Sequence, residues 1–319
     1  MSRANLLKKT FANIELFVLI LAAIGLIIIF SLLEPRFLTT NNFRIILETM
    51  SILGILSLGV NLLLIAGEID ISFTSVLEFA AAIAAISFAA QINAFLAIVF
   101  GVAAAAGVGL INAFFTVKLK IPSFLVTLAT QVAIGGLVLI FCDYRTVLIR
   151  NKSFTGLFFG RPIGNIATAV FWMIGIAIVL WFVLTKTKFG RWTYATGGNQ
   201  NSARLMGIPT DKVKIILFVA NAVLAAVAGF ILGSRAMSAR PAMGSSYLMP
   251  AISAPILAGA ALTGGQGSAY KTILAAFVLT LITNGVTLIG LEPAYRDIFM
   301  GIILVSALSV RYTQTLARD

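Results

Sequence analysis

Glutamates in apolar stretches are the residues of this sequence best suited to do chemistry inside a membrane. Glu15, Glu48 and Glu78 lie in three different stretches, and no pairing between them can be read from their positions. Histidine is absent and Cys142 is the sole cysteine, which excludes His-based catalytic triads, zinc sites and thiolate clusters. We therefore predict a non-enzymatic chain that holds no metal and no cofactor of its own.

Polar side chains at membrane depth are costly unless they pair or face a cavity, so they are candidates for lining a solute pathway. The candidates are Glu48, Asn61, Glu78, Asn112, Gln131, Asn221 and Asn284. For the amides, the alternative is a hydrogen bond between neighbouring helices. For Glu48 or Glu78, a further alternative is the ion site of a secondary transporter driven by protons or sodium.

Asp70 and Ser72 directly precede a predicted apolar helix. One interpretation gives these two residues a gating role in transport. The other makes them an N-terminal helix cap, in which the carboxylate also interacts favourably with the helix dipole.

The run 189–209 is the longest polar, glycine-punctuated segment of the chain. Gly197 and Gly198 are expected to break the preceding structure. Asn199 or Asn201 can cap a helix of two turns that ends at Gly207, before Pro209. This short helix either packs on its own bundle as an ordinary loop or docks into a partner protein as a lever. A helix of this length is not stable alone.

Composition defines the elements that must position these residues. The chain of 319 residues is 60% hydrophobic and only 11% charged, which is typical of a polytopic membrane protein. Apolar windows predict an all-α bundle of about ten membrane-spanning helices. They lie at 14–33, 45–66, 72–91, 93–117, 123–141, 166–184, 213–233, 250–263, 271–290 and 295–310. The windows 72–91 and 250–263 are the weakest and could be broken or re-entrant helices.

Positive charge predicts the orientation, because cytoplasmic loops retain Lys and Arg. The densest cluster lies at 186–214, which places that segment and both termini in the cytoplasm. The net charge of +12 is dispersed over loops rather than gathered on one helix, so nucleic-acid binding is not expected. The stretch 265–272 ends in Lys-Thr like a phosphate-binding loop, but Tyr270 stands where the second glycine is needed. Any ATPase must therefore be another polypeptide.

Four motifs together resemble the permease subunits of ribose/xylose-type bacterial ABC sugar importers, in the branched-chain amino acid/monosaccharide permease superfamily. The motifs are Gly67-Glu68-Ile69-Asp70-Ile71-Ser72, the run 120–130, the run from Lys188 to Ile208, and the glycine-rich run 257–268. The resemblance extends from about residue 45 to 310. It departs from the family where Glu68 replaces a usual glycine and Phe73-Thr74 replaces Val-Gly.

The resemblance implies a single transmembrane permease domain over residues 1–319, of the type II importer kind, in the bacterial inner membrane. Its cytoplasmic coupling segment would be about 186–213, with a coupling helix at 199–207. The residues that would contact the ATPase are Gly190, Arg191, Gly197, Gly198, Asn199, Ala203, Arg204, Leu205 and Gly207. The implied partners are ABC ATPase subunits that bind ATP and magnesium, a periplasmic solute-binding protein, and a second permease, identical or different.

Overall fold

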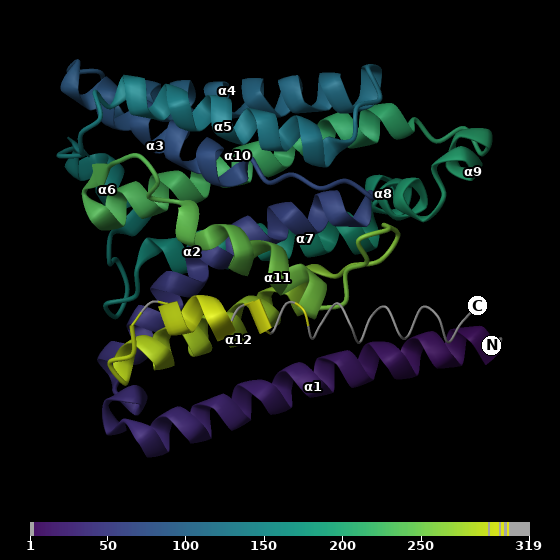
Figure 1. The fold of residues 1–319 in the computed structure, drawn as a ribbon, viewed down its shortest axis with the longest axis horizontal. Helices are drawn as coiled ribbons and strands as arrows, with labels where there is room; N and C mark the ends of the chain where they lie inside the picture. The colour runs from purple at the N-terminus through teal and green to yellow at the C-terminus, as the bar shows by residue number, and fades with distance from the viewer. Residues whose placement is uncertain (1–2, 293, 300, 303–304, 306–319) are drawn as a thin grey trace.

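The computed structural model describes residues 3–292, 294–299, 301–302 and 305, with side chains from residue 15 onward. They form an all-α bundle whose long helices run roughly parallel to one another (Figure 1). The helices are α1 (Arg3–Leu33), α2 (Thr40–Ile65), α3 (Phe73–Ala89), α4 (Ala94–Ala113), α5 (Ser123–Phe141), α6 (Lys152–Phe159), α7 (Thr168–Lys186), α8 (Lys188–Gly198), α9 (Gln200–Leu205), α10 (Thr210–Ala236), α11 (Leu248–Leu257) and α12 (Ala269–Leu288).

Short elements complete the described chain. Two 3-10 helices, η1 (Pro35–Leu38) and η3 (Ser245–Tyr247), precede α2 and α11, and a π-helix, η2 (Phe114–Lys118), extends α4. Strands β1 (Val147–Leu148) and β2 (Ser238–Ala239) pair antiparallel, with Val147 opposite Ala239. This pairing joins the loop after α5 to the loop after α10.

Seven helices within the described residues are long and apolar enough to cross a membrane. They are Glu15–Leu33, Thr40–Ile65, Ala94–Lys118, Ser123–Phe141, Thr168–Lys186, Thr210–Ala236 and Ala269–Leu288. These seven coincide closely with seven of the ten predicted windows. The prediction of an all-α polytopic membrane bundle is therefore confirmed, whereas the count of about ten spans is not.

The remaining three windows behave differently from one another. Helix α3 fills the window 72–91 with 17 residues. Helix α11 has ten residues with Pro255 inside it, about 15 Å in length, which is half of the roughly 30 Å hydrocarbon core. The window 250–263 is thus a half-helix followed by the loop 258–268, as the broken-helix alternative for this weak window predicts. The window 295–310 lies partly outside the described residues.

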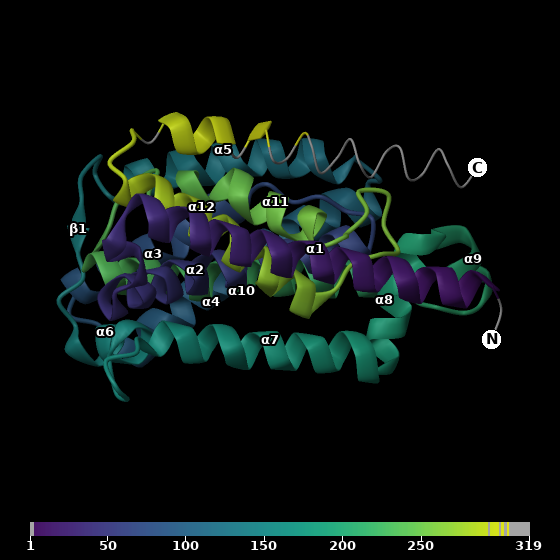
Figure 2. The ribbon, with the colours of Figure 1, turned by 90° about the horizontal axis from the view of Figure 1, so that it is seen from below.

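Helices α2 and α10 form the centre of the bundle. α10 packs against α2, α3 and α4, while α2 also packs against α7, α11 and α12. α1 and α7 lie at the periphery, on different sides (Figures 1 and 2). Large apolar side chains such as Phe17, Phe95 and Ile178 are exposed on the outer helices, as expected for surfaces that face lipid.

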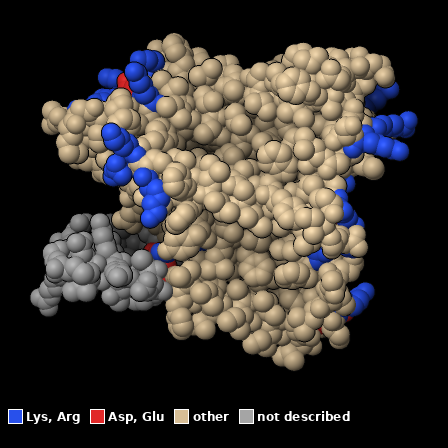
Figure 3. Space-filling model, turned by 180° about the vertical axis from the view of Figure 1, so that it is seen from behind, with Lys and Arg blue, Asp and Glu red and all other residues tan. Residues whose placement is uncertain are grey.

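Charged side chains mark the two ends of the bundle. Figure 3 shows Lys and Arg gathered at both ends, with a broad band of other residues between them. One end carries α8 and α9, and we call it the α8–α9 end. The opposite end, which carries α6 and the paired strands, is called the α6 end (Figure 1). An uncharged band between two charged ends is the surface that a bilayer requires.

The segment 66–72 between α2 and α3 is not helical, although it runs from the α8–α9 end into the middle of the bundle (Figure 1). Side chains of α5 satisfy its backbone. The amide of Ile69 donates to Ser123 Oγ at 3.1 Å, and the amide of Ile71 donates to Thr127 Oγ1 at 3.3 Å. Irregular backbone is tolerated at membrane depth only when protein groups or water satisfy it in this way.

Candidate functional site

Helices α8 and α9 protrude at one end of the bundle and contain the polar run that the sequence singled out (Figure 1). α8 is capped by Thr187, whose hydroxyl accepts a hydrogen bond from the amide of Gly190 at 3.2 Å, and it ends at Gly198. The Asn199 side chain accepts from the amide of Ser202 at 2.9 Å and caps α9. Gly207 follows with a φ of +78°, a conformation that glycine adopts without strain. The predicted short helix with its two ends is present.

The surface of α9 has an apolar tip. Ala203 is fully buried and faces the bundle, whereas the side chains of Leu205 and Met206 are exposed. Arg204 does not extend freely, because its guanidinium donates to Thr210 Oγ1 at 2.9 Å and pairs with Asp211 at the start of α10. Leu205 is 90% exposed and Met206 is 70% exposed, so within the described part of the chain little packs against these two adjacent apolar side chains.

Behind α9, three segments meet through their glycines. We call Gly67 after α2, Gly197 and Gly198 of α8, and Gly264 and Gly265 in the loop after α11 the glycine junction. A Cβ atom at Gly197 would overlap the carbonyl oxygen of Ile65 and lie 2.7 Å from the amide nitrogen of Gly265. That same amide donates to the Ile65 carbonyl at 2.8 Å. Backbone therefore packs on backbone, and the three segments cannot move apart independently without breaking this contact.

Tyr194 adds a side-chain contact to the glycine junction. Its hydroxyl donates to the carbonyl oxygen of Gly267 at 2.9 Å, which ties α8 to the loop before α12. Burial, and to a lesser degree the nearby Tyr270, raises the pKa of the Tyr194 phenol. The hydroxyl thus remains a neutral donor at physiological pH.

A buried ion pair connects α9, α10 and the segment 66–72. Lys214 Nζ of α10 lies 2.5 Å from Glu68 Oε1 and 2.9 Å from the side-chain oxygen of Gln200. Lys214 and Glu68 are both buried. Glu68, which departs from the family pattern, is thus neutralised by a lysine from another helix. The sequence singled out Glu68 but gave no sign that Lys214, in the first turns of an apolar helix, is its partner.

A second buried set, the Asp70 network, contains four of the predicted residues. Asp70 Oδ1 accepts from the amide and hydroxyl of Ser72 at 2.7 and 2.6 Å, and Asp70 Oδ2 accepts from Asn221 of α10 at 2.9 Å. Asn112 of α4 donates to Ser72 Oγ at 2.9 Å and accepts from Thr130 of α5 at 2.7 Å. Asp70, Ser72, Asn112 and Asn221 are all buried. The amides join helices here, as the alternative interpretation expected.

The other candidate amides are dispersed. Asn284 of α12 exchanges two hydrogen bonds of 2.9 Å with Asn42 of α2. Gln131 contributes its backbone carbonyl, which accepts from the Ser75 hydroxyl at 2.9 Å. Asn61 is buried in α2, and neither atom of its amide has a hydrogen-bond partner among the described residues.

Glu78 anchors a loop. Its two carboxylate oxygens accept from the amides of Ala242 and Gly244, at 3.1 and 3.0 Å, in the connection between α10 and α11. The carboxylate is buried and both oxygens are engaged by backbone donors.

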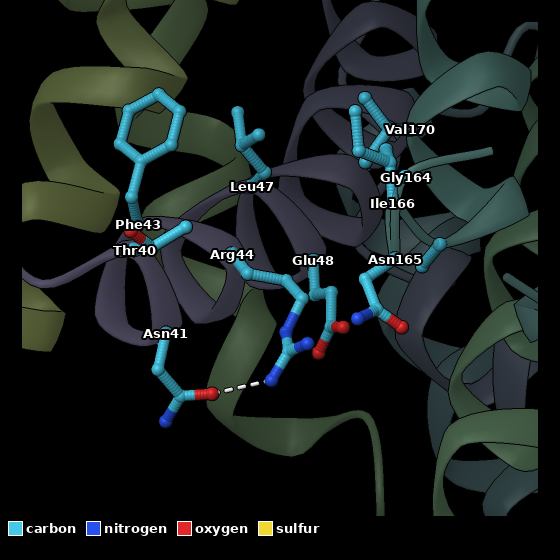
Figure 4. Close-up of a pocket in the computed structure, with 11 residues that line it drawn as sticks. Thr40, Asn41, Phe43, Arg44, Leu47, Glu48, Gly164, Asn165, Ile166 and Val170 are labelled. Carbon is cyan, nitrogen blue, oxygen red and sulfur yellow. Dashed lines mark hydrogen bonds between the residues drawn. The ribbon is translucent and has the colours of Figure 1, made fainter.

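Glu48 lies in a pocket of about 410 Å³ at the α6 end, between α2 and the segment that leads into α7 (Figure 4). It pairs with Arg161 at 3.0 Å, and its side chain is buried while that of Arg161 is partly exposed. Neither Arg161 nor the pocket residue Arg44 was singled out in the sequence, since both fall in polar regions flanking the spans. The pocket is separate from the Asp70 network, with which its lining shares no residue.

Comparison with known proteins gives consistent matches. The sequence model of the family described as "Branched-chain amino acid transport system / permease component" matches residues 42–308. The ribose import permease protein RbsC of Escherichia coli (strain K12) is 33% identical over 91% of this chain and 92% of its own. RbsC of Bacillus subtilis (strain 168) is 34% identical over 88% of both chains. The L-arabinose transport system permease protein AraH of Escherichia coli (strain K12) is 33% identical over 92% of both. No solved structure matches the chain.

Proposed function

Because this chain belongs to the family of permease components that its sequence matches over residues 42–308, we propose that it is the membrane-spanning permease subunit of an ATP-driven sugar importer. Two of its relatives are named as a ribose import permease protein and an L-arabinose transport system permease protein. A monosaccharide is therefore the proposed cargo. The chain forms one transmembrane permease domain of the type II importer kind, and ATP with magnesium binds to a separate ATPase subunit.

One observation carries the proposal. The exposed apolar side chains at the end of α9 directly follow α8, which is held in close backbone contact at the glycine junction. Leu205 and Met206 are exposed on α9, and α8 directly before them meets α2 and the loop after α11 at the glycine junction. The tip is suited to dock into an ATPase groove as an amphipathic helix does. A displacement of α8 is then passed to two segments of the bundle. The segment 186–213 is thus the proposed coupling segment, with α9 as the coupling helix.

The Asp70 network is the proposed gating element. It lies where the irregular segment 66–72 enters the bundle, and the Lys214 pair links that segment to α9 through Gln200. Irregular segments at membrane depth often border solute pathways in transporters. A coupling motion would therefore reach Asp70 and Ser72 through a short chain of contacts.

Topology and partners follow from the same proposal. The α8–α9 end is cytoplasmic in the bacterial inner membrane, together with both termini. Two ATPase domains bind that end, a second permease of the same or a different sequence completes the pathway, and a periplasmic sugar-binding protein docks at the α6 end.

The test is uptake of labelled monosaccharide into proteoliposomes that contain the permease, its co-purified ATPase and its binding protein. Leu205→Glu places a charge on the apolar tip without touching the bundle, so ATP-dependent uptake and co-purification of the ATPase should both fall strongly. Leu205→Met is the matched control, because it keeps an apolar side chain at the same exposed position. Normal uptake by Leu205→Glu would contradict the coupling role of α9.

The same preparation separates the proposal from ion-driven transport. A secondary transporter using Glu48 or Glu78 works as a single chain in an ion gradient. Uptake driven by protons or sodium without ATPase would overturn the proposal. In the structure both carboxylates are engaged by protein groups, Glu48 by Arg161 and Glu78 by two backbone amides.

A further inference from the structure

The pocket around Glu48 has the form of a small-molecule site. It is enclosed by the first turns of α2 and by residues 164–170, and its volume of about 410 Å³ is within the range typical of ligand pockets. Thr40, Arg44 and Glu48 follow one another at four-residue spacing, which places them on one face of α2. Figure 4 shows the Arg44, Glu48 and Asn165 side chains next to one another.

The polar groups of the pocket are only partly used by the protein. Arg161 occupies one oxygen of Glu48, and an Arg44 guanidinium nitrogen donates to Asn41. The Arg44 Nε atom is buried and has no hydrogen-bond partner in the part of the chain that the structure describes. Arg161 donates to Glu48 Oε1, which leaves Oε2 as the second carboxylate acceptor. The site therefore presents an acceptor and a donor of opposite charge side by side, and a buried donor without a partner is costly unless a ligand or water supplies an acceptor.

Phe43 supplies an apolar surface at the same site. Phe43 lines the pocket and is 53% exposed, and its ring points away from the Arg44 guanidinium and the Glu48 carboxylate (Figure 4). A ligand suited to this lining has hydroxyls that both donate and accept hydrogen bonds, and one apolar face that can pack on an aromatic ring. Each hydroxyl of a neutral polyhydroxylated ring can donate to the Glu48 carboxylate and accept from the Arg44 guanidinium, so such a ring fits both groups.

We propose that the pocket formed by Thr40, Arg44, Glu48 and residues 164–170 is a binding site for a neutral monosaccharide at the α6 end. This rests on the proposed function and adds to it the place where the sugar is held before it enters the bundle. Glu48 accepts from ring hydroxyls, Arg44 donates to them, and Arg161 orients the Glu48 carboxylate.

The experiment is protection from labelling, which detects weak binding. Cys142, the native cysteine, is buried and is replaced by Ala. Leu47→Cys then places a thiol in the pocket, and Ile92→Cys places a half-buried thiol in a different hollow at the same end. The complete transporter complex is treated with a maleimide in the presence of D-ribose, D-xylose, L-arabinose or D-galactose, and separately in the presence of L-leucine.

At least one sugar should slow labelling of Leu47→Cys in a saturable manner and leave Ile92→Cys unaffected. In the Leu47→Cys background, Glu48→Gln should raise the half-protecting concentration roughly tenfold, as expected for one lost hydrogen bond to a charged group. Asp143→Asn is the matched control, because it makes the same change at an exposed carboxylate of the same end. An unchanged labelling rate without sugar shows that Glu48→Gln has not altered the fold.

Three results would contradict either the proposed binding site or the proposed importer function. If no sugar protects the thiol in a complex that still takes up sugar with ATP, the pocket is not a sugar site, and the proposed function is unaffected. If L-leucine protects the thiol and no sugar does, the pocket binds an amino acid and the proposed monosaccharide ligand is wrong. Absence of ATP-dependent uptake of every sugar contradicts the proposed function itself. If Glu48→Gln fails to assemble, protection measured with native Glu48 still decides the proposal.

Discussion

Two adjacent glycines in α8 differ completely in what surrounds them. A Cβ atom at Gly197 would overlap the Ile65 carbonyl, whereas one at Gly198 would meet no atom within 4 Å. We expect Gly197→Ala to force α8 away from α2 and to abolish ATP-dependent uptake. Gly198→Ala should take up sugar at a rate close to wild type, and its helix propensity should add about 0.5–1 kcal/mol to the free energy of unfolding. Uptake assays on the two variants check this. Equal activity of the two variants would show that the glycine junction does not transmit motion.

Asn61 is a second residue with an unusual environment. Its buried amide lacks hydrogen-bond partners among the described residues, and such a group costs about 1–3 kcal/mol. Asn61→Leu should therefore raise the thermal unfolding temperature of the purified permease. Asn221→Leu is the contrasting variant, because it removes a bond to buried Asp70 and should lower that temperature. A lower unfolding temperature for Asn61→Leu would mean that water or an ion satisfies the amide.

At the residue scale, the sequence indicated several polar side chains that lie buried in the bundle, but not what those side chains contact. Asp70, Ser72, Asn112 and Asn221 stand out because polar groups are rare in apolar helices. Their assembly into one network depends on how four separate elements pack, and no local pattern encodes that. Arg161 could not be linked to Glu48, since the two residues are 113 positions apart.

At the scale of elements, the Glu68–Lys214 pair ties the segment 66–72 to α9 and α10. Removing one partner of a buried ion pair typically costs about 3–5 kcal/mol, because the other charge stays buried without compensation. Glu68→Lys and Lys214→Glu should each lose uptake and unfold at lower temperature, and the double exchange should recover a large part of both. A double variant no better than the single ones would show that these positions act independently.

The long elements were predictable because seven apolar windows of spanning length correspond to seven helices. The short ones were not, for a physical reason. The ten residues of α11 and the irregular segment 66–72 depend on backbone hydrogen bonds supplied by other elements, such as Ser123 and Thr127 of α5. Hydropathy measures the apolar character of a window and contains no information about such partners.

At the scale of the whole molecule, exposed basic residues occur at both ends of the bundle. Lys118, Lys120 and Arg191, which follow α4 or lie in α8, are exposed, as are Arg145, Arg150 and Lys152 between α5 and the start of α6. Figure 3 shows basic side chains at both ends of the bundle. The positive-inside rule therefore assigns the α8–α9 end to the cytoplasm only because its cluster of Lys and Arg at 186–214 is denser.

Single cysteines in a Cys142→Ala background can decide the orientation, because the native thiol is buried and its removal leaves no other. Asn201→Cys lies on exposed α9, and Arg145→Cys on an exposed loop of the α6 end. If the coupling segment is cytoplasmic, a membrane-impermeant maleimide should label Arg145→Cys in cells whose outer membrane alone is permeable, and Asn201→Cys only after the inner membrane is opened. The reverse pattern would place α9 where no ATPase can reach it, and the coupling role would fail even if the bundle transports sugar.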